Sequence, residues 1–392
     1  MVISVIIGSF YPAVIYGGPV FTALYSTQEL ARLGAKVYVS TTNANGNDVL
    51  DVETNKFLSF ENNLLVKYYS GANKNGNSFN FCFNVWKDIK QADIVHIQAI
   101  FSFWAVVALF YAFIFRLPVL LTPHGCLGAW CVSSKKHFFK KVWLSIFVKP
   151  FLKKLYFHAT SDQELTDIHS YFPDASVFTV PNGINLEEFN TINKLTRSDL
   201  VYKFTGTVFN PKYVITSLGR IDTKKGYDIL IDSFHALKNI LSESVILIAG
   251  QDYGAKNDLL LQIEKLGLQN NVFLIGHIDG QDKIDFLANG DLFVLPSHNE
   301  NFGLVYAESL AAGTPVIAST NTPWADIERF NCGKWVPNTV TETAAAISTM
   351  LNSDLETMGH NGKRFVADNF SWPAIAYKLL KVLSQINGSG HE

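Results

Sequence analysis

The stretch LFVLPSHNENFGLVYAESLAAGTPVIA, residues 292–318, decides the fold class of this chain. It opens with a short apolar run, passes through a polar loop, continues as an amphipathic segment and ends in a second apolar run. Apolar runs that alternate with helix-length amphipathic segments are typical of β-α-β units with parallel strands. The stretch therefore predicts a strand over 292–295, a helix over 302–312 and a strand over 315–318.

The same alternation extends in both directions along the chain. Further strands are predicted at 3–7, 36–40, 93–97, 119–122, 177–180, 213–218, 245–249 and 272–275, and helices at 19–33, 226–241, 255–266 and 281–288. We expect an α/β protein with two doubly wound Rossmann-like domains that face each other across a cleft. The expected boundaries are 1–190, 191–372 and a C-terminal helix over 373–392 that crosses back to the first domain, with the polar stretch 190–210 as linker. Ligands of such sheets lie beyond the carboxyl ends of the strands.

Composition narrows the possible functions. The chain has 392 residues, 48% of them hydrophobic, and a mean hydropathy of +0.14, which excludes a disordered protein. A net charge of −2 and a pI of about 6.6 give no reason to expect nucleic-acid binding. The four cysteines show no zinc or disulfide spacing, and residues 1–8 read as a buried strand rather than a signal peptide. We therefore expect a reduced, cytoplasmic chain.

One apolar segment, AIFSFWAVVALFYAFIF at 99–115, resembles a membrane span. Its 17 residues stand at the lower limit for crossing a bilayer, and Arg116 and Pro118 end it before the next strand. We expect a core helix here, with a membrane span as the alternative.

The loop and helix within 297–308 carry two carboxylates, Glu300 and Glu308. A helical rise of 1.5 Å per residue places them on the order of 10 Å apart, too far for a glycosidase pair. This spacing suits a ligand with two hydroxyl-bearing rings, such as a nucleotide-sugar. The backbone amides of Asn301, Phe302, Gly303 and Leu304 could contact the sugar or the diphosphate between the rings. The alternative is an N-terminal acid followed by a surface glutamate.

Three shorter motifs also follow predicted strands. Arg220 can form a fork with phosphate oxygens and Lys225 adds a point charge, unless both are solvated loop charges. His124 ends a strand and is a catalytic candidate, although a lone histidine is more often structural. Gly17 and Gly18 would admit a phosphate or sugar at a helix start, unless they only form a tight turn.

These motifs together resemble the retaining glycosyltransferases of GT-B fold, glycosyltransferase family four, also called glycosyl transferases group one. The resemblance implies that Glu308 binds the donor ribose, that Glu300 with the 301–304 amides holds the transferred sugar, and that His124 lies beside this sugar. Arg220 and Lys225 would hold the diphosphate. The full implied donor set is Gly17, Gly18, Arg220, Lys225, Glu300, Asn301, Phe302, Gly303, Leu304 and Glu308, and the implied catalytic set is His124, Glu300, Arg220 and Lys225. Asn301 stands where the family often has glycine, so the donor sugar and base stay open.

The expected reaction is transfer of a hexosyl or N-acetylhexosaminyl group from a nucleoside-diphosphate-sugar to a saccharide with retention of configuration. The chain has no Asp-x-Asp, so we expect neither a metal nor another cofactor, and cationic side chains would stabilise the leaving diphosphate instead. A nucleotide-sugar epimerase or hydrolase of the same fold is one alternative. A non-catalytic sugar-binding protein is a second.

The segment 94–161 contains no Asp or Glu but holds Arg116 and seven lysines, interspersed with aromatic residues. Lysines beside interfacial aromatics suit an anionic membrane surface or a lipid diphosphate. We expect Lys135, Lys136, Lys140, Lys141 and Trp143 to form this membrane or acceptor surface, unless the aromatics fill the core and the lysines are solvated. The implied acceptor is a polyprenyl-diphosphate-linked saccharide at the inner face of the cytoplasmic membrane, in the synthesis of O-antigen, capsule or exopolysaccharide.

Overall fold

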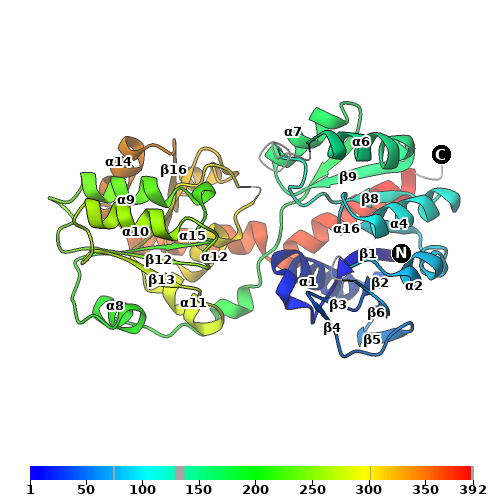
Figure 1. The fold of residues 1–392 in the computed structure, drawn as a ribbon, viewed down its shortest axis with the longest axis horizontal. Coiled ribbons are helices and arrows are strands. Elements are labelled where there is room, and N and C mark those ends of the chain that lie inside the picture. Colours follow the sequence, from blue (N-terminus) through cyan, green and yellow to red (C-terminus); the bar gives the residue numbers. More distant parts are fainter. Residues whose placement is uncertain (74–75, 129–136, 301, 390–392) are drawn as a thin grey trace. The chain divides into compact units, whose positions relative to one another are not determined.

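A computed structural model of the chain describes residues 1–73, 76–128, 137–300 and 302–389. The chain forms two compact units (Figure 1). Unit 1 comprises Met1–Gly183 together with Trp372–Glu392, and unit 2 comprises Ile184–Ser371. Ile184 and Phe189, which the sequence placed in the first domain, are buried in the core of unit 2. The C-terminal helix, Trp372–Ser389, packs on unit 1.

Unit 1 is built on an eight-stranded sheet, counted over the described residues, in the order β10-β9-β8-β7-β1-β2-β6-β5. The strands are β1 (Val2–Ser9), β2 (Lys36–Thr42), β5 (Phe57–Glu61), β6 (Leu64–Tyr69), β7 (Ile94–Ile97), β8 (Val119–Leu121), β9 (Leu155–Ala159) and β10 (Ser176–Thr179). Each neighbouring pair is parallel except β5 and β6, which form an antiparallel edge. A separate antiparallel pair joins β3 (Ala44–Asn45) to β4 (Asp48–Val49). The inner strands are buried on both faces, which explains why most of their residues are apolar.

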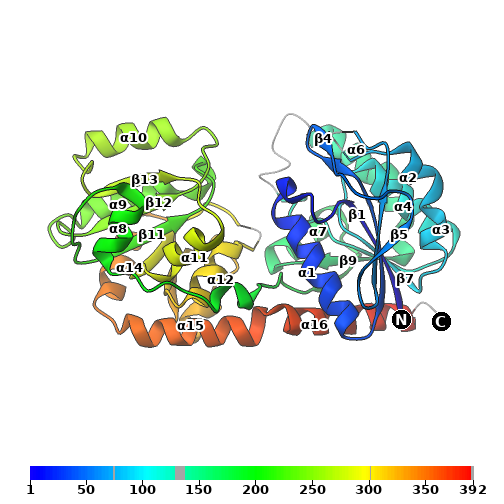
Figure 2. The same cartoon turned by 90° about the horizontal axis from the view of Figure 1, so that it is seen from below.

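Helices cover both faces of this sheet (Figure 2). They are η1 (Val14–Tyr16), α1 (Gly18–Arg32), α2 (Phe79–Asn84), α3 (Trp86–Ile89), α4 (Phe103–Ile114), α6 (His137–Phe147), η2 (Lys149–Lys154), α7 (Asp162–Tyr171) and α16 (Trp372–Ser389). α16 packs beside α1, and its apolar side chains complete the core that β1 and β2 begin.

The apolar segment 99–115 forms α4, a helix of 12 residues. Its Trp104, Ala108 and Ala112 are buried against the sheet, so one face of this helix packs into the core, while Phe110 and Phe113 on its other face are about half exposed. Among the helices that the structure describes, none combines the length and the apolar character needed to cross a bilayer.

Unit 2 is built on a six-stranded parallel sheet, again counted over the described residues, in the order β13-β12-β11-β14-β15-β16. Its strands are β11 (Val214–Leu218), β12 (Val245–Ala249), β13 (Val272–Gly276), β14 (Leu292–Leu295), β15 (Val316–Ser319) and β16 (Gly333–Val336). Its helices are η3 (Leu186–Phe189), α8 (Arg197–Thr205), η4 (Thr223–Lys225), α9 (Tyr227–Ala236), α10 (Lys256–Lys265), α11 (Gly280–Ala288), α12 (Leu304–Ala312), α13 (Asp326–Arg329), α14 (Val340–Leu351) and α15 (Leu355–Phe370). α9 packs beside α10 and α14, while α12 packs beside α11 and α15.

The strand order fixes where each sheet can bind a ligand. In unit 2, β11 has β12 on one side and β14 on the other, so the chain reverses its direction of growth between β11 and β14. In unit 1 the same reversal falls between β1 and β7. Ligands of open parallel sheets lie beyond the carboxyl ends of the strands at such a reversal.

Two expected elements differ in the structure. Residues 190–210 are not a bare linker, because they contain α8, which Thr196 and Asp199 open with a reciprocal capping box. α12 begins at Leu304 instead of residue 302, because Gly303 has left-handed backbone angles and acts as its N-cap.

Candidate active site

The reversal point of unit 2 brings together two of the predicted site residues. Lys225 follows β11, Glu300 follows β14, and Lys225 Nζ lies 2.5 Å from Glu300 Oε1. The two side chains are only 13% and 11% exposed. Ser297 Oγ donates a second hydrogen bond to the same carboxylate oxygen at 3.1 Å. The pair is therefore held in a largely desolvated position at the carboxyl edge of the sheet.

Hydrogen bonds from β15 and from the segment just before α13 hold the loop that carries Glu300. Ser319 Oγ donates to the Ser297 carbonyl at 2.5 Å. The indole of Trp324, which is buried, donates to the Phe302 carbonyl at 2.6 Å and packs on the Phe302 ring. Both bonds are made to backbone carbonyls of the loop. They therefore fix the backbone that carries Glu300 independently of the conformation of its side chain.

The loop after β11 is also in direct contact with the loop after β14. His298 N donates to the Lys224 carbonyl at 2.8 Å. A Cβ atom on Gly226 would lie 2.2 Å from the Pro296 carbonyl oxygen, and Gly226 has a φ of +69°. Only glycine fits here, so this residue permits the contact between the two loops.

Glu308, the second predicted carboxylate, lies on α12 and pairs with Lys283 of α11 at 2.9 Å. Both side chains are partly exposed, at 20% and 23%. Sequence reasoning missed Lys283, because nothing in its local pattern distinguishes it from a solvated lysine. The ion pair orients the Glu308 carboxylate, and the partial exposure of this side chain leaves it accessible to a ligand hydroxyl.

Arg220 is exposed and lies over the ring of Tyr253, with its guanidinium carbon 5.1 Å from the ring centroid. This cation–π contact holds the side chain near the end of β11 while its N–H groups stay available. Tyr227 Oη donates to the Gly219 carbonyl at 2.9 Å, which fixes the backbone just before Arg220.

The other residues of unit 2 that were predicted to bind the donor lie around the start of α12. Phe302 is buried, whereas Gly303, the N-cap of α12, and Leu304, its first residue, are partly exposed. Asn301 lies outside the described residues.

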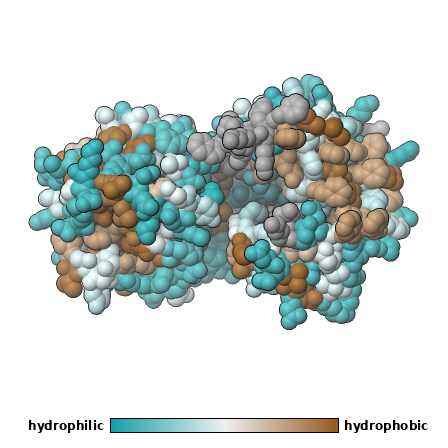
Figure 3. Space-filling view, in the orientation of Figure 1, coloured by the Kyte–Doolittle hydropathy of each residue, from teal (hydrophilic) through white to brown (hydrophobic). Residues whose placement is uncertain are grey.

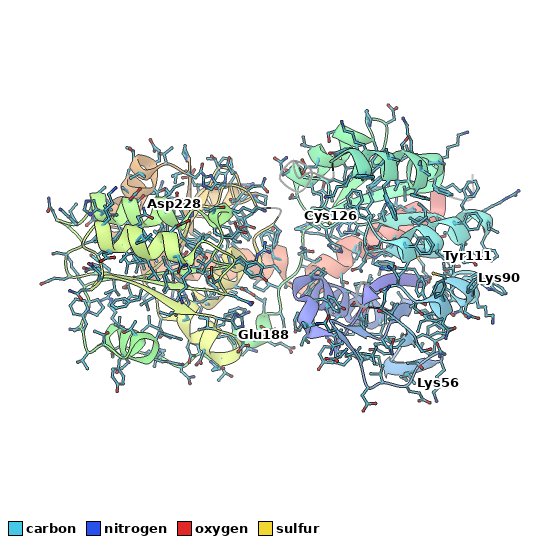
Figure 4. The ribbon with its side chains drawn as sticks, viewed as in Figure 1. Lys56, Lys90, Tyr111, Cys126, Glu188 and Asp228 are labelled. Carbon is cyan, nitrogen blue, oxygen red and sulfur yellow. The ribbon has the colours of Figure 1, made fainter. Side chains whose placement is uncertain are left out.

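A hollow of about 250 Å³ lies beside the Asp222–Thr223 turn in unit 2. Its lining includes three aspartates, of which Asp228 is labelled in Figure 4. A lining of carboxylates repels a diphosphate, so this hollow is a poor place for one.

The predicted residues of unit 1 surround its own strand ends. His124 follows β8 with a φ of +53°, and Gly125 follows with +74°. Glu164, fully buried at the start of α7, accepts a hydrogen bond of 2.5 Å from Gly125 N and another from Thr160 N at 2.8 Å. Burial lowers the pKa of His124 to about 4, against the opposing charge of Glu164, so the imidazole is neutral at pH 7. Exposed Cys126 follows in the same loop (Figure 4).

Gly17 and Gly18 lie at the start of α1, beyond the end of β1. Gly17 has a φ of +69°, and a Cβ atom on either glycine would meet no atom within 4 Å. The helix start is therefore open to a ligand. The assignment of these two glycines to the donor stays a prediction.

The predicted basic surface is described only in part. Lys135 and Lys136 lie outside the described residues. Lys141 is exposed, and Lys140 Nζ lies 5.1 Å from the centroid of the Phe101 ring. Trp143 is half-buried and donates to the Ile100 carbonyl at 2.9 Å, so it attaches α6 to the segment before α4.

Two open, mainly parallel sheets, each with polar residues at the reversal of its strand order, are the architecture of the GT-B glycosyltransferases. Comparison with known proteins agrees in both units. The family described as Glycosyltransferase Family 4 matches residues 16–188, and the family described as Glycosyl transferases group 1 matches residues 202–365. The chain belongs to glycosyltransferase family four, with the GT-B fold.

Similar proteins include enzymes with different substrates. Mannosylfructose-phosphate synthase of Agrobacterium fabrum is 32% identical over 36% of this chain and 32% of its own length. The capsular polysaccharide biosynthesis glycosyltransferase CapM of Staphylococcus aureus is 32% identical over 50% of each chain. These matches thus span about a third to a half of the relatives' length.

Solved structures agree over the whole chain. HepE of Anabaena, in complex with UDP, has a TM-score of 0.71 at 20% identity and covers 98% of this chain and 99% of its own. Sucrose-phosphate synthase of Thermosynechococcus elongatus has a TM-score of 0.69 at 20% identity and covers 99% and 100%. At these identities the likeness shows the fold.

Proposed function

We propose that this chain transfers a hexosyl or N-acetylhexosaminyl group from a nucleoside-diphosphate-sugar to a saccharide, with retention of anomeric configuration. The observation that carries this proposal is the contact between Lys225 and Glu300 at the β11/β14 reversal, the place where such a sheet binds a nucleotide. A partly desolvated cation beside a carboxylate suits a ligand that carries phosphates next to hydroxyl groups. The UDP complex of the structurally similar HepE supports the same class of donor.

The roles follow from the contacts. A donor phosphate would take over part of the Lys225 ammonium, and Arg220 would add a forked contact. Glu300, relieved of part of its ion pair, would accept hydrogen bonds from the transferred sugar. Glu308, already held by Lys283, would accept them from the ribose.

The transfer breaks the bond between the anomeric carbon and a phosphate oxygen and forms a bond between this carbon and the acceptor oxygen. The acceptor proton passes to the departing phosphate, on the face that the acceptor enters, so configuration is retained. Charge that develops on the leaving diphosphate is stabilised by Arg220 and Lys225. We propose that these cations suffice without a metal; loss of activity in EDTA with recovery in Mg²⁺ would refute this.

A donor screen tests the proposal. UDP-, GDP- and ADP-sugars are compared for protection against heat, where a ligand at one hundred times its Kd adds about 2.7 kcal/mol. We expect one nucleotide to protect, and we expect sugar release only with an acceptor present. Turnover of the donor alone would favour an epimerase or hydrolase. Protection without any turnover would favour a sugar-binding protein.

For the acceptor we propose a polyprenyl-diphosphate-linked saccharide of bacterial surface polysaccharide synthesis, reached at the inner face of the cytoplasmic membrane. An aromatic face on α2, α4 and α6 of unit 1 supports this proposal (Figure 3). Its exposed side chains are Phe79, Phe83, Phe103, Phe110, Phe113, Phe139 and Ile146, each at least half exposed.

Exposed lysines lie on or next to the elements of unit 1 that carry the aromatic face. Lys90, at its edge with Tyr111 (Figure 4), and Lys141 are exposed, as is Lys149. Nearby Asp88 does not offset them, because it is buried and bonded to Lys67. Aromatic side chains within a cationic rim fit an anionic bilayer, where each lysine contributes about 1 kcal/mol.

Flotation with anionic liposomes at low salt tests this surface. Phe110→Ser/Phe113→Ser should abolish flotation, whereas Leu261→Ser, which removes an equally exposed apolar side chain from unit 2, should not. Wild-type protein that stays with the unbound fraction would overturn the membrane proposal and leave the donor proposal intact.

A further inference from the structure

A small cavity lies under the loop that carries His124. It measures about 20 Å³, and His96 of β7, Gln98 and Thr122 just after β7 and β8, and His158 of β9 line it, besides His124 itself. Thr22 and Ser26 of α1 and Trp372, Ile375 and Leu379 of α16 cover it. Roughly 10–15 Å³ of such space is enough for one water molecule.

The hydrogen bonds around this cavity determine where each proton lies. His158 Nε2 lies 2.7 Å from the Val180 carbonyl, which can only accept, so Nε2 carries the proton. Burial lowers the pKa of His158, so the ring is neutral and its Nδ1 is an acceptor. Thr122 Oγ1, 3.0 Å from this Nδ1, must therefore donate to it.

The same argument extends to His96. Its Nε2 lies 2.9 Å from Thr122 Oγ1, whose only proton is already committed, so His96 Nε2 must donate to that oxygen. Burial and the neighbouring His158 and His124 hold the pKa of His96 well below its usual value. The neutral ring carries a single proton, so His96 Nδ1 is an unprotonated acceptor.

Three buried polar atoms of the cavity residues then lack a partner among the described residues. They are His96 Nδ1, Gln98 Oε1 and His124 Nε2. Two of them, His96 Nδ1 and Gln98 Oε1, are acceptors. A buried acceptor without a donor is destabilising, so one small molecule with two O–H groups and one acceptor site fits the set. Water has this composition and this size.

We propose that the cavity holds one ordered water molecule that fixes the proton of His124 on Nε2. The water donates to His96 Nδ1 and Gln98 Oε1 and accepts from His124 Nε2–H. Nδ1 of His124 is then the nitrogen left to accept a hydrogen bond from a substrate hydroxyl, a consequence that rests on the proposed function. His96, Thr122 and His158 are positioning residues that act on His124 through this water.

Tautomers can be read directly by ¹⁵N NMR of the full chain labelled at histidine, with each signal assigned by replacing one histidine. We expect the wild-type protein to show His96, His124 and His158 protonated on Nε2 at pH 7.5. A proton on Nδ1 of either His96 or His124 would overturn the proposal. A crystal structure that shows this cavity dry would overturn it as well.

Thr122 provides a matched pair of variants. Thr122→Val keeps the side-chain shape but removes the acceptor of His96 Nε2, so the proton of His96 should move to Nδ1 and that of His124 should follow. Thr122→Ser keeps the hydroxyl and should keep the wild-type tautomers.

Where sugar transfer is measurable, Thr122→Val should lower kcat by at least about tenfold with little change in the donor KM, whereas Thr122→Ser should keep the wild-type kcat. Unchanged tautomers in Thr122→Val would refute the coupling, and if that variant does not fold, the wild-type spectrum alone decides. The NMR result stands even if no transferase activity is found.

Discussion

Replacing Lys225 by methionine tests the centre of the proposed donor site. The change keeps the length of the side chain but leaves the Glu300 carboxylate, 11% exposed, with only the Ser297 hydroxyl, at 3.1 Å, as a side-chain partner among the described residues. Breaking a buried ion pair from one side costs about 3–5 kcal/mol, and the residual exposure here favours the lower end, about 3 kcal/mol. For a domain of this size each kcal/mol lowers Tm by about 2–4 °C, so the expected shift is roughly 6–12 °C.

The double variant Lys225→Met/Glu300→Gln separates stability from activity. It buries no unpaired charge, so calorimetry should show most of the lost Tm regained. Transfer should stay about 10²–10³-fold below wild type in both variants, because the diphosphate has lost a cation. A double variant whose Tm loss equals the sum of the two single losses would refute the ion-pair reasoning, and near-normal turnover in Lys225→Met would remove Lys225 from the mechanism.

Three further outcomes follow from the structure. Gly250→Ala should sharply reduce soluble, folded protein, judged by yield and thermal unfolding, because its Cβ atom would lie 1.8 Å from a backbone carbonyl oxygen after β11; a wild-type Tm would contradict this packing. Glu308→Gln should raise the Kd of the protecting nucleotide by about 10–100-fold in calorimetric titration, because a hydrogen bond to a charged group is lost. An unchanged Kd would place the ribose elsewhere. His96, His124 and His158 have folded-state pKa values below the unfolded value of about 6.5, so the unfolded chain binds more protons in acid. Urea unfolding should therefore show the full free energy of unfolding of unit 1 above about pH 6.5. Below this pH the free energy of unfolding should fall by up to about 1.4 kcal/mol per pH unit for each histidine. Equal stability at pH 7.5 and pH 5 would show that these rings are not buried as neutral groups.

The central strands were predictable because burial on both faces makes them predominantly apolar. β12, for example, is buried along its whole length and is bounded as the sequence predicts. The edge hairpin of β5 and β6 was missed, although Asn63 with a φ of +63° marks its turn. β16 was also missed, since its four residues carry neither alternation nor a long apolar run.

Lys225 and Glu300 were named from their charges, from their places after predicted strands and from the family resemblance, and the strand order brings the two side chains together. Their roles toward a donor stay predictions. Lys283 and Ser319 were not found, because their roles depend on which elements become neighbours. The start of α12 was misplaced by two residues. A glycine at position 303 is compatible with the first turn of a helix as well as with a left-handed N-cap, so the sequence does not distinguish the two.

The interrupted make-up of unit 1 has a consequence for biosynthesis. Unit 2 is one continuous segment and can complete its core while residues 372–389 are still inside the ribosome. Unit 1 is synthesised first but waits for α16, whose Trp372, Ile375, Leu379, Leu383 and Ile386 fill its core. During that interval the apolar side of α1 is uncovered, and this is the stage at which a nascent chain would recruit a chaperone.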